Sequence, residues 1–282
     1  MNNNNQSMTN TYHLGPKLGE GRIAEIFAWG DTQAIKLFRP GRSMDEAEYE
    51  ATLTRIAHQA GLAAPAVYEV CQVDGRAGIV MERVDGPSML HVSIRRPWML
   101  QHSARQLADL HVQMHRRSSA DRQAAADLPS QRQSLQRNIE RALRLDQATK
   151  DRLLQGLAQM PNGESICHED FHPDNILLTA SGPVIIDWVT ARRGHPLADV
   201  ARTVILLSLG EPPNTPPWIH ALFLVIRRIY LDTYLGRYCT QQGASRAEIE
   251  TWIPFRAAAR LNEDIPGEQD ALLKLIDKGM PR

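Results

Sequence analysis

The chain has 282 residues, and its 32 Lys and Arg residues balance its 32 Asp and Glu residues, so the formal net charge is zero. This balance gives no bulk electrostatic reason to expect a nucleic-acid or a membrane partner, and the length suits two modest lobes. The three cysteines are scattered, without C-x-x-C spacing or a disulfide framework. They predict reduced thiols and a cytoplasmic location.

The first residues do not have the composition of a signal peptide. Residues 1–11 are rich in Asn and lack a basic region followed by an apolar one, so we expect a disordered tail. The most apolar stretch, residues 221–226, is ended by two arginines and is too short to span a bilayer.

Residues 12–86 predict a small β-rich lobe. We expect a strand, a glycine turn and a strand in residues 15–27, a strand at 33–38, a helix at 44–60 that stops at Gly61, and two further strands at 66–73 and 77–84. The sequence Asp85-Gly86-Pro87 then breaks the pattern, which places the lobe boundary after residue 86.

Two glycines and a lysine of this lobe suggest a phosphate site. Gly19 and Gly21 resemble the glycine-rich loop of kinases, whose backbone amides approach phosphate groups because no side chain intervenes, although a hairpin turn explains them equally well. Lys36 ends the sequence Ala34-Ile35-Lys36, which matches the kinase lysine motif and lies in the strand expected at 33–38. A buried ammonium needs a carboxylate, and Glu46 and Glu50 lie one helical turn apart within reach.

Residues 87–282 predict a larger and mainly helical lobe. Apolar periodicity favours helices at 98–115, within 131–160, and at 198–209, 218–239, 245–261 and 270–278. The polar segment 118–129 predicts a mobile surface connection. Residues 164–189 are strand-rich and carry most of the candidate chemistry.

The most specific pattern is H-x-D-x-x-x-x-N followed by an apolar run that ends in Asp. It places Asp170, Asn175 and Asp187 at the spacing used for phosphoryl transfer. Asp170 is the candidate that orients or deprotonates the attacking hydroxyl. Asn175 and Asp187 are candidate ligands for Mg²⁺, which favours oxygen donors and bridges the phosphates of ATP.

The same residues also match the zinc motif H-E-x-x-H at His168 and His172. That motif requires a continuous helix, whereas Pro173 follows the second histidine directly and disfavours a helical conformation there. We therefore prefer the kinase interpretation, with both histidines as braces of the loop. Asp199, near the start of a predicted helix, is a candidate to brace the same loop.

Taken together, these motifs resemble the aminoglycoside phosphotransferase (APH) and choline-kinase-like family, which has a protein-kinase-like fold. The family pattern H-G-D-x-H-x-x-N-I-L corresponds to residues 168–177, and its I-D-W and G-x-P-x-x-D-x-A motifs correspond to residues 186–188 and 194–201. The resemblance implies an α+β fold of two lobes and an ATP- and Mg²⁺-dependent kinase acting on a hydroxyl of a small molecule, such as an aminoglycoside-like antibiotic, an amino alcohol or a sugar.

The resemblance also assigns three residues that spacing alone left open. It points to Glu50 as the partner of Lys36, and it places the Glu82 carbonyl and the Val84 amide at the adenine. Two departures from the family pattern concern flexibility and nucleotide affinity: Ala24 stands where the loop has its third glycine, and Glu169 stands where a glycine is frequent.

Two alternatives remain beside the small-molecule kinase. A catalytically silent nucleotide-binding protein of the same fold is disfavoured because the lysine, both aspartates and the asparagine are all present. A protein kinase is disfavoured because no A-P-E segment or long activation loop follows Asp187. The acceptor itself is not predicted, since nine acidic and nine basic residues follow Thr203. Glu263, Asp264, Glu268 and Asp270 could form a local acidic patch or a solvated helix end, and the oligomeric state is open.

Overall fold

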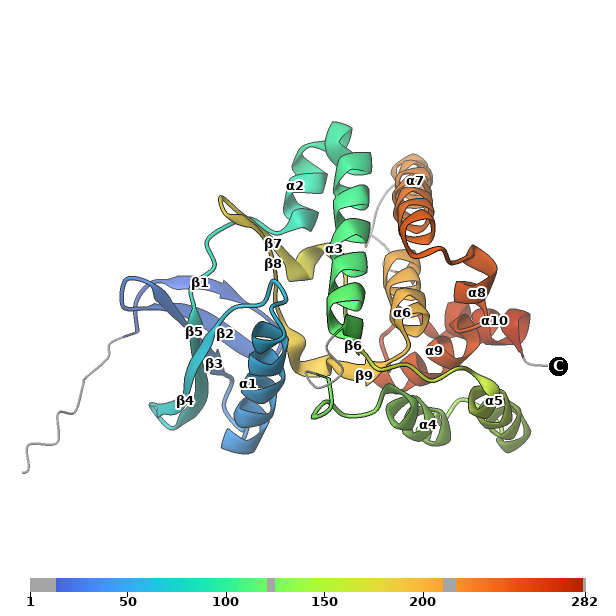
Figure 1. Ribbon diagram of the computed structural model, residues 1–282, viewed down its shortest axis with the longest axis horizontal. Helices are drawn as coiled ribbons and strands as arrows, with labels where there is room; N and C mark the ends of the chain where they lie inside the picture. The colour runs from blue at the N-terminus through green and yellow to red at the C-terminus, as the bar shows by residue number, and fades with distance from the viewer. Residues whose placement is uncertain (1–13, 121–124, 210–216, 281–282) are drawn as a thin grey trace, which may run out of the picture.

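The computed structural model describes residues 14–120, 125–209 and 217–280, so the predicted tail at 1–11 lies outside the described residues. The chain forms a small β-rich lobe followed by a larger and mainly helical lobe, as the sequence predicts (Figure 1). Among the described residues, no helix combines the length and apolarity that crossing a membrane requires.

The small lobe is one antiparallel sheet with a single helix against it. Its strands lie in the order β1-β2-β3-β5-β4. Their bounds are β1 Lys17–Glu20, β2 Ala24–Trp29, β3 Gln33–Phe38, β4 Val67–Val73 and β5 Arg76–Glu82. Helix α1, Met44–Gln59, begins at a capping box in which the side chains of Ser43 and Glu46 accept from each other's backbone amides. It ends before Gly61, whose φ of +69° suits glycine.

Strand β3 separates its side chains between two faces of the sheet. Ile35 and Leu37 belong to one buried cluster, and Phe38 belongs to another that includes Ala47 and Ala51 of α1. Because successive side chains of a strand point to opposite faces, Lys36 shares the face of Phe38. The alternation of the strand therefore directs the lysine toward α1.

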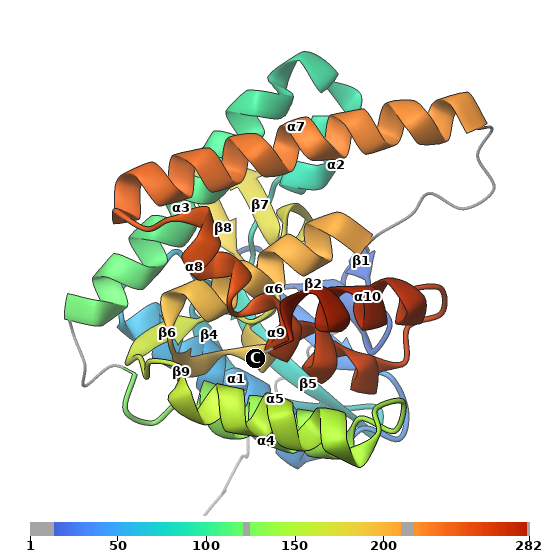
Figure 2. The same cartoon turned by 90° about the vertical axis from the view of Figure 1, so that its right-hand side faces the viewer.

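The larger lobe is built from nine α-helices and two short two-stranded sheets among the described residues. The helices are α2 Met89–Arg95, α3 Leu100–Ala120, α4 Gln131–Arg141, α5 Gln147–Gln159, α6 Pro196–Leu209, α7 Pro217–Gln242, α8 Arg246–Glu250, α9 Ile253–Arg260 and α10 Gln269–Gly279. Strand β6, Ser165–Cys167, pairs with β9, Arg192–Gly194, and β7, Ile176–Thr179, pairs with β8, Gly182–Ile185. Figure 2 shows α7 crossing one side of this lobe, with α4 and α5 on the opposite side.

Three features of this lobe differ from the sequence predictions. The helix expected at 245–261 is two helices, α8 and α9, because Pro254 fits the start of a helix but not its interior. The surface connection expected at 118–129 is wrong where it is described: α3 continues to residue 120, and Ala125 and Leu128 are buried. Helix α2 and strand β9 were not predicted at all.

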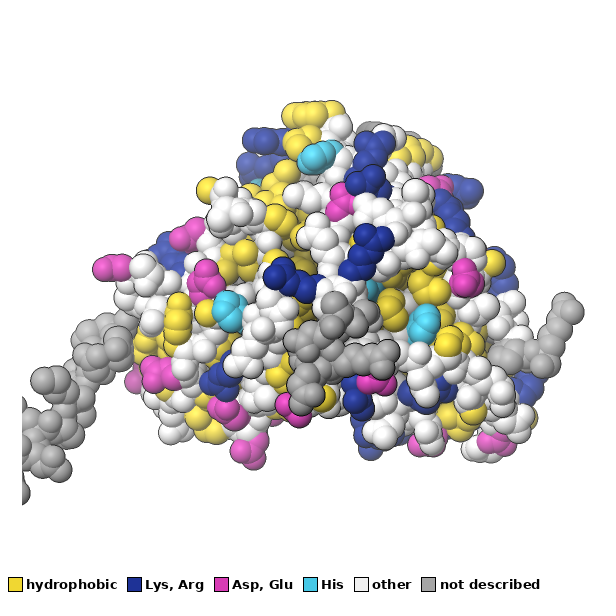
Figure 3. All heavy atoms as spheres, viewed as in Figure 1, with side chains coloured by type: hydrophobic (Ala, Val, Ile, Leu, Met, Phe, Trp, Pro, Cys, Tyr) yellow, Lys and Arg dark blue, Asp and Glu magenta, His cyan; other side chains and the backbone are white. Residues whose placement is uncertain are grey.

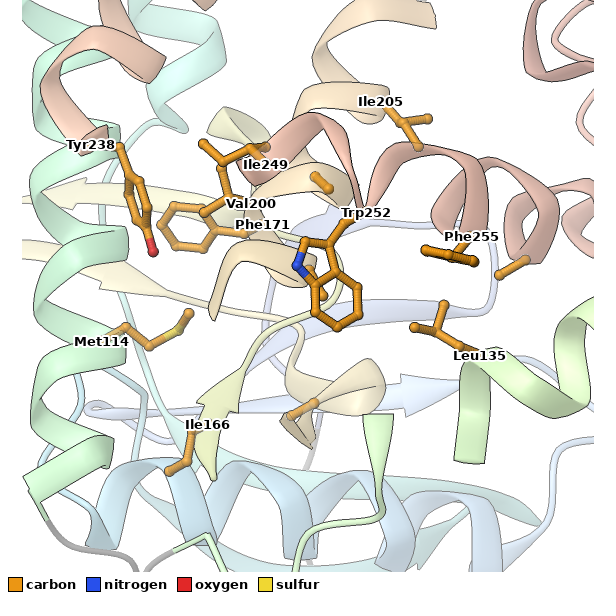
Figure 4. Packing of buried hydrophobic residues seen from close by; sticks show 14 of the residues in the cluster. Met114, Leu135, Ile166, Phe171, Val200, Ile205, Tyr238, Ile249, Trp252 and Phe255 are labelled. Carbon is orange, nitrogen blue, oxygen red and sulfur yellow. The ribbon is translucent and has the colours of Figure 1, made fainter. Parts of the chain in front are cut away.

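Aromatic side chains of the C-terminal helices fill the main core. Trp252 is 3 % exposed and Phe255 is 2 % exposed, and both lie among the packed residues of Figure 4. The Trp252 ring stacks on His195, with 5.2 Å between ring centroids. These residues therefore stabilise the lobe by burying apolar surface. The side chain of Trp218 lies outside the described part of the chain.

Candidate active site

The predicted catalytic segment is an irregular loop between β6 and β7. Glu169 has a left-handed backbone with φ of +69°, and residues Pro173–Asn175 form a single 3₁₀ turn. The Nδ1 atom of His172 accepts from the Asp174 amide at 3.3 Å and caps that turn. The segment is not an α-helix, which is the geometry that the zinc motif requires.

Two histidines of this loop hold Asp170. Its backbone amide donates to Nδ1 of His168 at 3.2 Å, and its Oδ2 lies 3.5 Å from Nε2 of His172. Burial alone would raise the pKa of Asp170, but the hydrogen bond and charge of His172, with the charge of Arg202, outweigh it and lower the pKa to about 2. The carboxyl group is therefore ionised at neutral pH.

Asn175 joins Asp170 to the segment that carries Asp187. Its side-chain Nδ2 donates to the Asp170 carbonyl at 2.9 Å and to Asp170 Oδ2 at 3.2 Å, while its own carbonyl accepts from the Ile186 amide at 2.9 Å. Since the nitrogen of the amide faces Asp170, its oxygen is turned away from that carboxylate. Asp187 itself has a left-handed backbone with φ of +65° and a side chain that is 40 % exposed.

Lys36 connects the two lobes at this point. Its Nζ donates to Oε1 of Glu50 at 2.5 Å and to Oδ1 of Asp187 at 3.2 Å. Burial lowers the pKa of the lysine, but the charges of Glu50 and Asp187 outweigh burial and the pKa is raised, so the ammonium is charged. Glu50, and not Glu46, is thus the partner of Lys36. Glu46 caps α1 and pairs with Arg42 at 2.9 Å.

The remaining predicted residues lie in the small lobe or at its end. A Cβ added at Gly19 would meet nothing within 4 Å, so the packing of the protein does not require glycine there. Glu82 ends β5, and its backbone amide donates to the carbonyl of Ala66 at 2.8 Å. Within the described residues, no hydrogen bond involves the Val84 amide, and no hydrogen bond or ion pair joins Glu82 or Val84 to Lys36 or the catalytic loop.

Asp199 of α6 braces the catalytic loop from below, as predicted. Its two carboxylate oxygens accept from the backbone amides of His168 and Glu169, both at 2.8 Å. The Nε2 atoms of His111 and His115 also face Asp199 Oδ2, at 3.1 and 3.2 Å, and their Nδ1 atoms contact tyrosine hydroxyl groups of α7. Neither histidine is among the residues predicted from the sequence, although their i, i+4 spacing on α3 was an available signal.

This buried network predicts that the protein loses stability in mild acid. Burial and the neighbouring His115 lower the pKa of His111 to about 4, whereas an unfolded histidine titrates near 6.5. As the pH falls, this histidine therefore takes up a proton in the unfolded chain before it does so in the folded protein. The free energy of unfolding should decrease by about 2 kcal/mol from this group between pH 7 and pH 5.

Urea unfolding at several pH values measures this loss. The variant His111→Gln keeps a polar side chain but cannot titrate, so its unfolding free energy should fall by about 2 kcal/mol less over the same range. Equal pH slopes for the two proteins would contradict the assignment.

Glu169 occupies an unusual position for a charged side chain. Its carboxylate is 10 % exposed and binds the guanidinium of Arg256 on α9 through two hydrogen bonds, one of them 2.5 Å long. The side chain of Gln131 donates to the same carboxylate at 2.8 Å, and Arg256 also donates to the Ala198 carbonyl at 2.8 Å. The residue beside Asp170 is thus tied to α4, α6 and α9.

Alternating charges continue from the catalytic loop along the C-terminal helices. Arg202 donates to the Glu169 carbonyl at 3.1 Å and pairs with Glu263 at 2.6 Å. Arg260 pairs with Glu263 at 2.9 Å and with Glu268 at 2.6 Å. Four acidic residues could form a patch here according to the sequence. The charges of two of them, Glu263 and Glu268, are neutralised by ion pairs with arginines.

Two cavities lie near these elements. A cavity of about 360 Å³ lies beside the lysine pair and is lined by Ile23, Phe38, Arg42, Asp45, Glu46, Tyr49, Glu50 and Val189. The Oε2 atom of Glu50 is buried there without a partner among the described residues. Another of about 260 Å³ lies behind the catalytic loop, at the start of α4, and none of the predicted site residues lines it.

Comparison with known proteins adds independent findings. The model of the phosphotransferase enzyme family, APH, matches residues 17–269. No curated protein matches the chain. Among solved structures, an amicoumacin kinase in complex with AMP-PNP, Ca²⁺ and Ami is similar with a TM-score of 0.61 and 18 % identity, over 95 % of this chain and 89 % of that one.

Two further structures have the same fold. An aminoglycoside-3'-phosphotransferase of type VIII has a TM-score of 0.57 and 20 % identity, over 90 % of this chain and 92 % of that one. A choline/ethanolamine kinase family protein from Mesorhizobium loti has a TM-score of 0.55 and 18 % identity, over 97 % of this chain and 88 % of that one.

Proposed function

This chain belongs to the phosphotransferase enzyme family and is a small-molecule kinase, and from that premise we propose that it transfers the γ-phosphoryl group of ATP, with Mg²⁺, to a hydroxyl group of its substrate. The observation that carries the proposal is the chain of contacts from Glu50 through Lys36 to Asp187, beside the contact of Asn175 with Asp170. It gathers a cation for the phosphates and oxygens for a metal near one carboxylate that can address a hydroxyl.

Each residue has a distinct part in the proposed reaction. Lys36, oriented by Glu50, binds phosphate oxygens of the nucleotide, while the amides around Gly19 and Gly21 cover them. The backbone at Glu82 and Val84 receives the adenine. Asp170 accepts a hydrogen bond from the acceptor hydroxyl and holds its oxygen in line with the γ-phosphorus.

The residues present fit a hard divalent cation. The oxygen of the Asn175 amide is free of Asp170, and the carboxylate of Asp187 is part-exposed with one oxygen near Lys36. Oxygen donors of this kind suit Mg²⁺, which retains several water molecules. When bound, the ion neutralises charge on the phosphates. The amicoumacin kinase, solved with AMP-PNP and Ca²⁺, supports a nucleotide and a cation at this fold's site.

The acceptor that we propose carries few positive charges. A polycationic aminoglycoside would need several free carboxylates. Of the four acidic residues that could form an acidic patch, Glu263 and Glu268 are already paired with arginines, which leaves Asp264 and Asp270. Neutral sugars, amino alcohols and macrolides therefore rank above polycationic aminoglycosides in an assay of ADP release. Turnover of aminoglycosides alone would reverse that order without affecting the assignment as a kinase.

Replacing Lys36 by Met should lower kcat/KM for ATP by about 10²- to 10³-fold, because the phosphates lose their charged donor. Lys17→Met is the matched control: Lys17 lies in the same lobe but pairs with Glu20 and Glu25 at the surface, and its kcat/KM should stay near that of the wild type. Equal losses in both lysine variants would contradict the role of Lys36.

Removing divalent cations with a chelator should abolish turnover, and added Mg²⁺ should restore it.

The alternative is a protein that binds the nucleotide but catalyses nothing. An assay with sugars, amino alcohols, macrolides and aminoglycosides distinguishes the two, with ATP affinity measured in parallel by calorimetry. The Asp170→Asn variant should bind ATP with very little turnover. If the wild type behaved in the same way with every compound, the silent protein would become the better explanation.

A further inference from the structure

Exposed hydrophobic side chains are concentrated at one end of the helical lobe. The described residues include twelve large hydrophobic side chains that are exposed, and seven of them lie on α2, the turn that follows it and the first half of α7. These are Leu90, Ile94, Trp98, Leu222, Leu224, Val225 and Ile229, which we call the apical patch. Trp98 is 78 % exposed and Ile94 is 71 % exposed, and the other five side chains are between 40 % and 55 % exposed.

The two segments of the apical patch are neighbours in space. Tyr230 of α7 contacts Met89 at 3.8 Å and Ser103 at 3.5 Å, and Tyr234 contacts His111 at 2.7 Å, so α3 and α7 run side by side in the same direction. The contact of Tyr230 with Met89 thus brings α7, next to Ile229, against the start of α2, next to Leu90. Figure 3 shows hydrophobic and basic side chains together along this upper edge of the molecule.

Positive charge accompanies the exposed hydrophobic side chains. No described ion pair involves Arg95, Arg96 or Arg105. Arg228 is 86 % exposed and lies 3.6 Å from Asp232, a carboxylate that also binds Arg246 at 2.6 Å. The sequence has no acidic residue in 86–108 or in 212–231. The net charge of the whole chain is zero, but the region of the apical patch is basic.

We propose that the apical patch docks the protein on an anionic lipid surface. Tryptophan and branched aliphatic side chains favour the boundary between headgroups and acyl chains, and arginines at the same level bind lipid phosphates. The charge argues against a second copy of this chain as the occupant, because a two-fold contact through the patch would bring its arginines together. The docking is peripheral and independent of the proposed reaction.

Sedimentation with vesicles tests the proposal on the full chain. Vesicles of phosphatidylglycerol and phosphatidylcholine should retain the protein at low salt, and pure phosphatidylcholine vesicles should retain much less. Each arginine removed should weaken the binding about five-fold, and added salt should weaken it further. The variant Ile94→Ser with Trp98→Ser should lose most of the binding as well.

A control variant changes one hydrophobic and one basic residue elsewhere on the surface. Leu143 is 96 % exposed and Arg144 is exposed on the far side of the lobe, so Leu143→Ser with Arg144→Glu should bind vesicles like the wild type. Circular dichroism and thermal unfolding check that each variant is folded. The proposal is overturned by absence of binding to anionic vesicles, by equal loss in the control, or by a dimer in light scattering that the patch variants dissociate.

Discussion

Substituting Asp170 by Asn is expected to lower kcat by about 10²- to 10⁴-fold and to leave the affinity for ATP unchanged. The amide keeps the shape of the side chain and can still contact Asn175, but it cannot accept the proton of the acceptor hydroxyl. Because the pKa of Asp170 is lowered to about 2, the wild type should show no loss of kcat from protonation of this group between pH 5 and pH 8. Steady-state kinetics with a turned-over acceptor measures both effects.

Asp174→Asn provides the matched control for this variant. Asp174 lies four residues away in the same loop and is exposed, and its side chain makes none of the contacts of Asp170. Its kcat should remain within a few-fold of the wild type. A loss of ATP affinity in Asp170→Asn as large as the loss of kcat would show that the residue acts on the nucleotide and not on the acceptor.

The second large effect concerns the buried pair of Glu169 and Arg256. Replacing Arg256 by Met should destabilise the protein by about 3–5 kcal/mol, because it leaves the Glu169 carboxylate buried without its main partner. The double variant Glu169→Gly with Arg256→Met should recover most of that loss, since it removes both charges. It also relieves the left-handed backbone of Glu169, which disfavours a side chain by about 1 kcal/mol.

Urea unfolding of the single and double variants measures this coupling. The control is Arg246→Met, which breaks an ion pair with Asp232. The side chain of Arg246 is 47 % exposed and that of Asp232 is 45 % exposed. That pair should contribute less than about 1 kcal/mol. If Arg256→Met were as mild as Arg246→Met, or if the double variant were no more stable than the single one, the account of a buried charged clamp would be wrong.

The grouping of the candidate site residues could be predicted because the motif fixes their spacing along a short segment, while their roles remain predictions. Asp170 and Asn175 lie in one loop, and Asp187 follows the adjacent hairpin, so a local motif contains most of the geometry. The alternation of β3 and the register of α1 similarly determine that Lys36 faces Glu50. Long-range contacts of this kind are readable from sequence only where a family pattern supplies the register.

Contacts between distant segments could not be predicted in the same way. Arg256 lies 87 residues from Glu169, and nothing in its local sequence distinguishes it from a solvated arginine on a helix. The sequence shows that Glu169 stands where the family pattern has glycine, but its partner depends on how α9 packs against α6. The ion pairs of Glu263 and Glu268 with arginines could not be predicted either, because the composition gives the number of charges and not their positions in space.

The most direct test of this account is a crystal structure with a non-hydrolysable ATP analogue and Mg²⁺. We expect the metal within about 2.0–2.1 Å of an Asp187 oxygen and of the Asn175 amide oxygen. We also expect Lys36 on the phosphates and the γ-phosphate facing Asp170. A nucleotide bound elsewhere, or a metal held by neither Asn175 nor Asp187, would contradict the central claim.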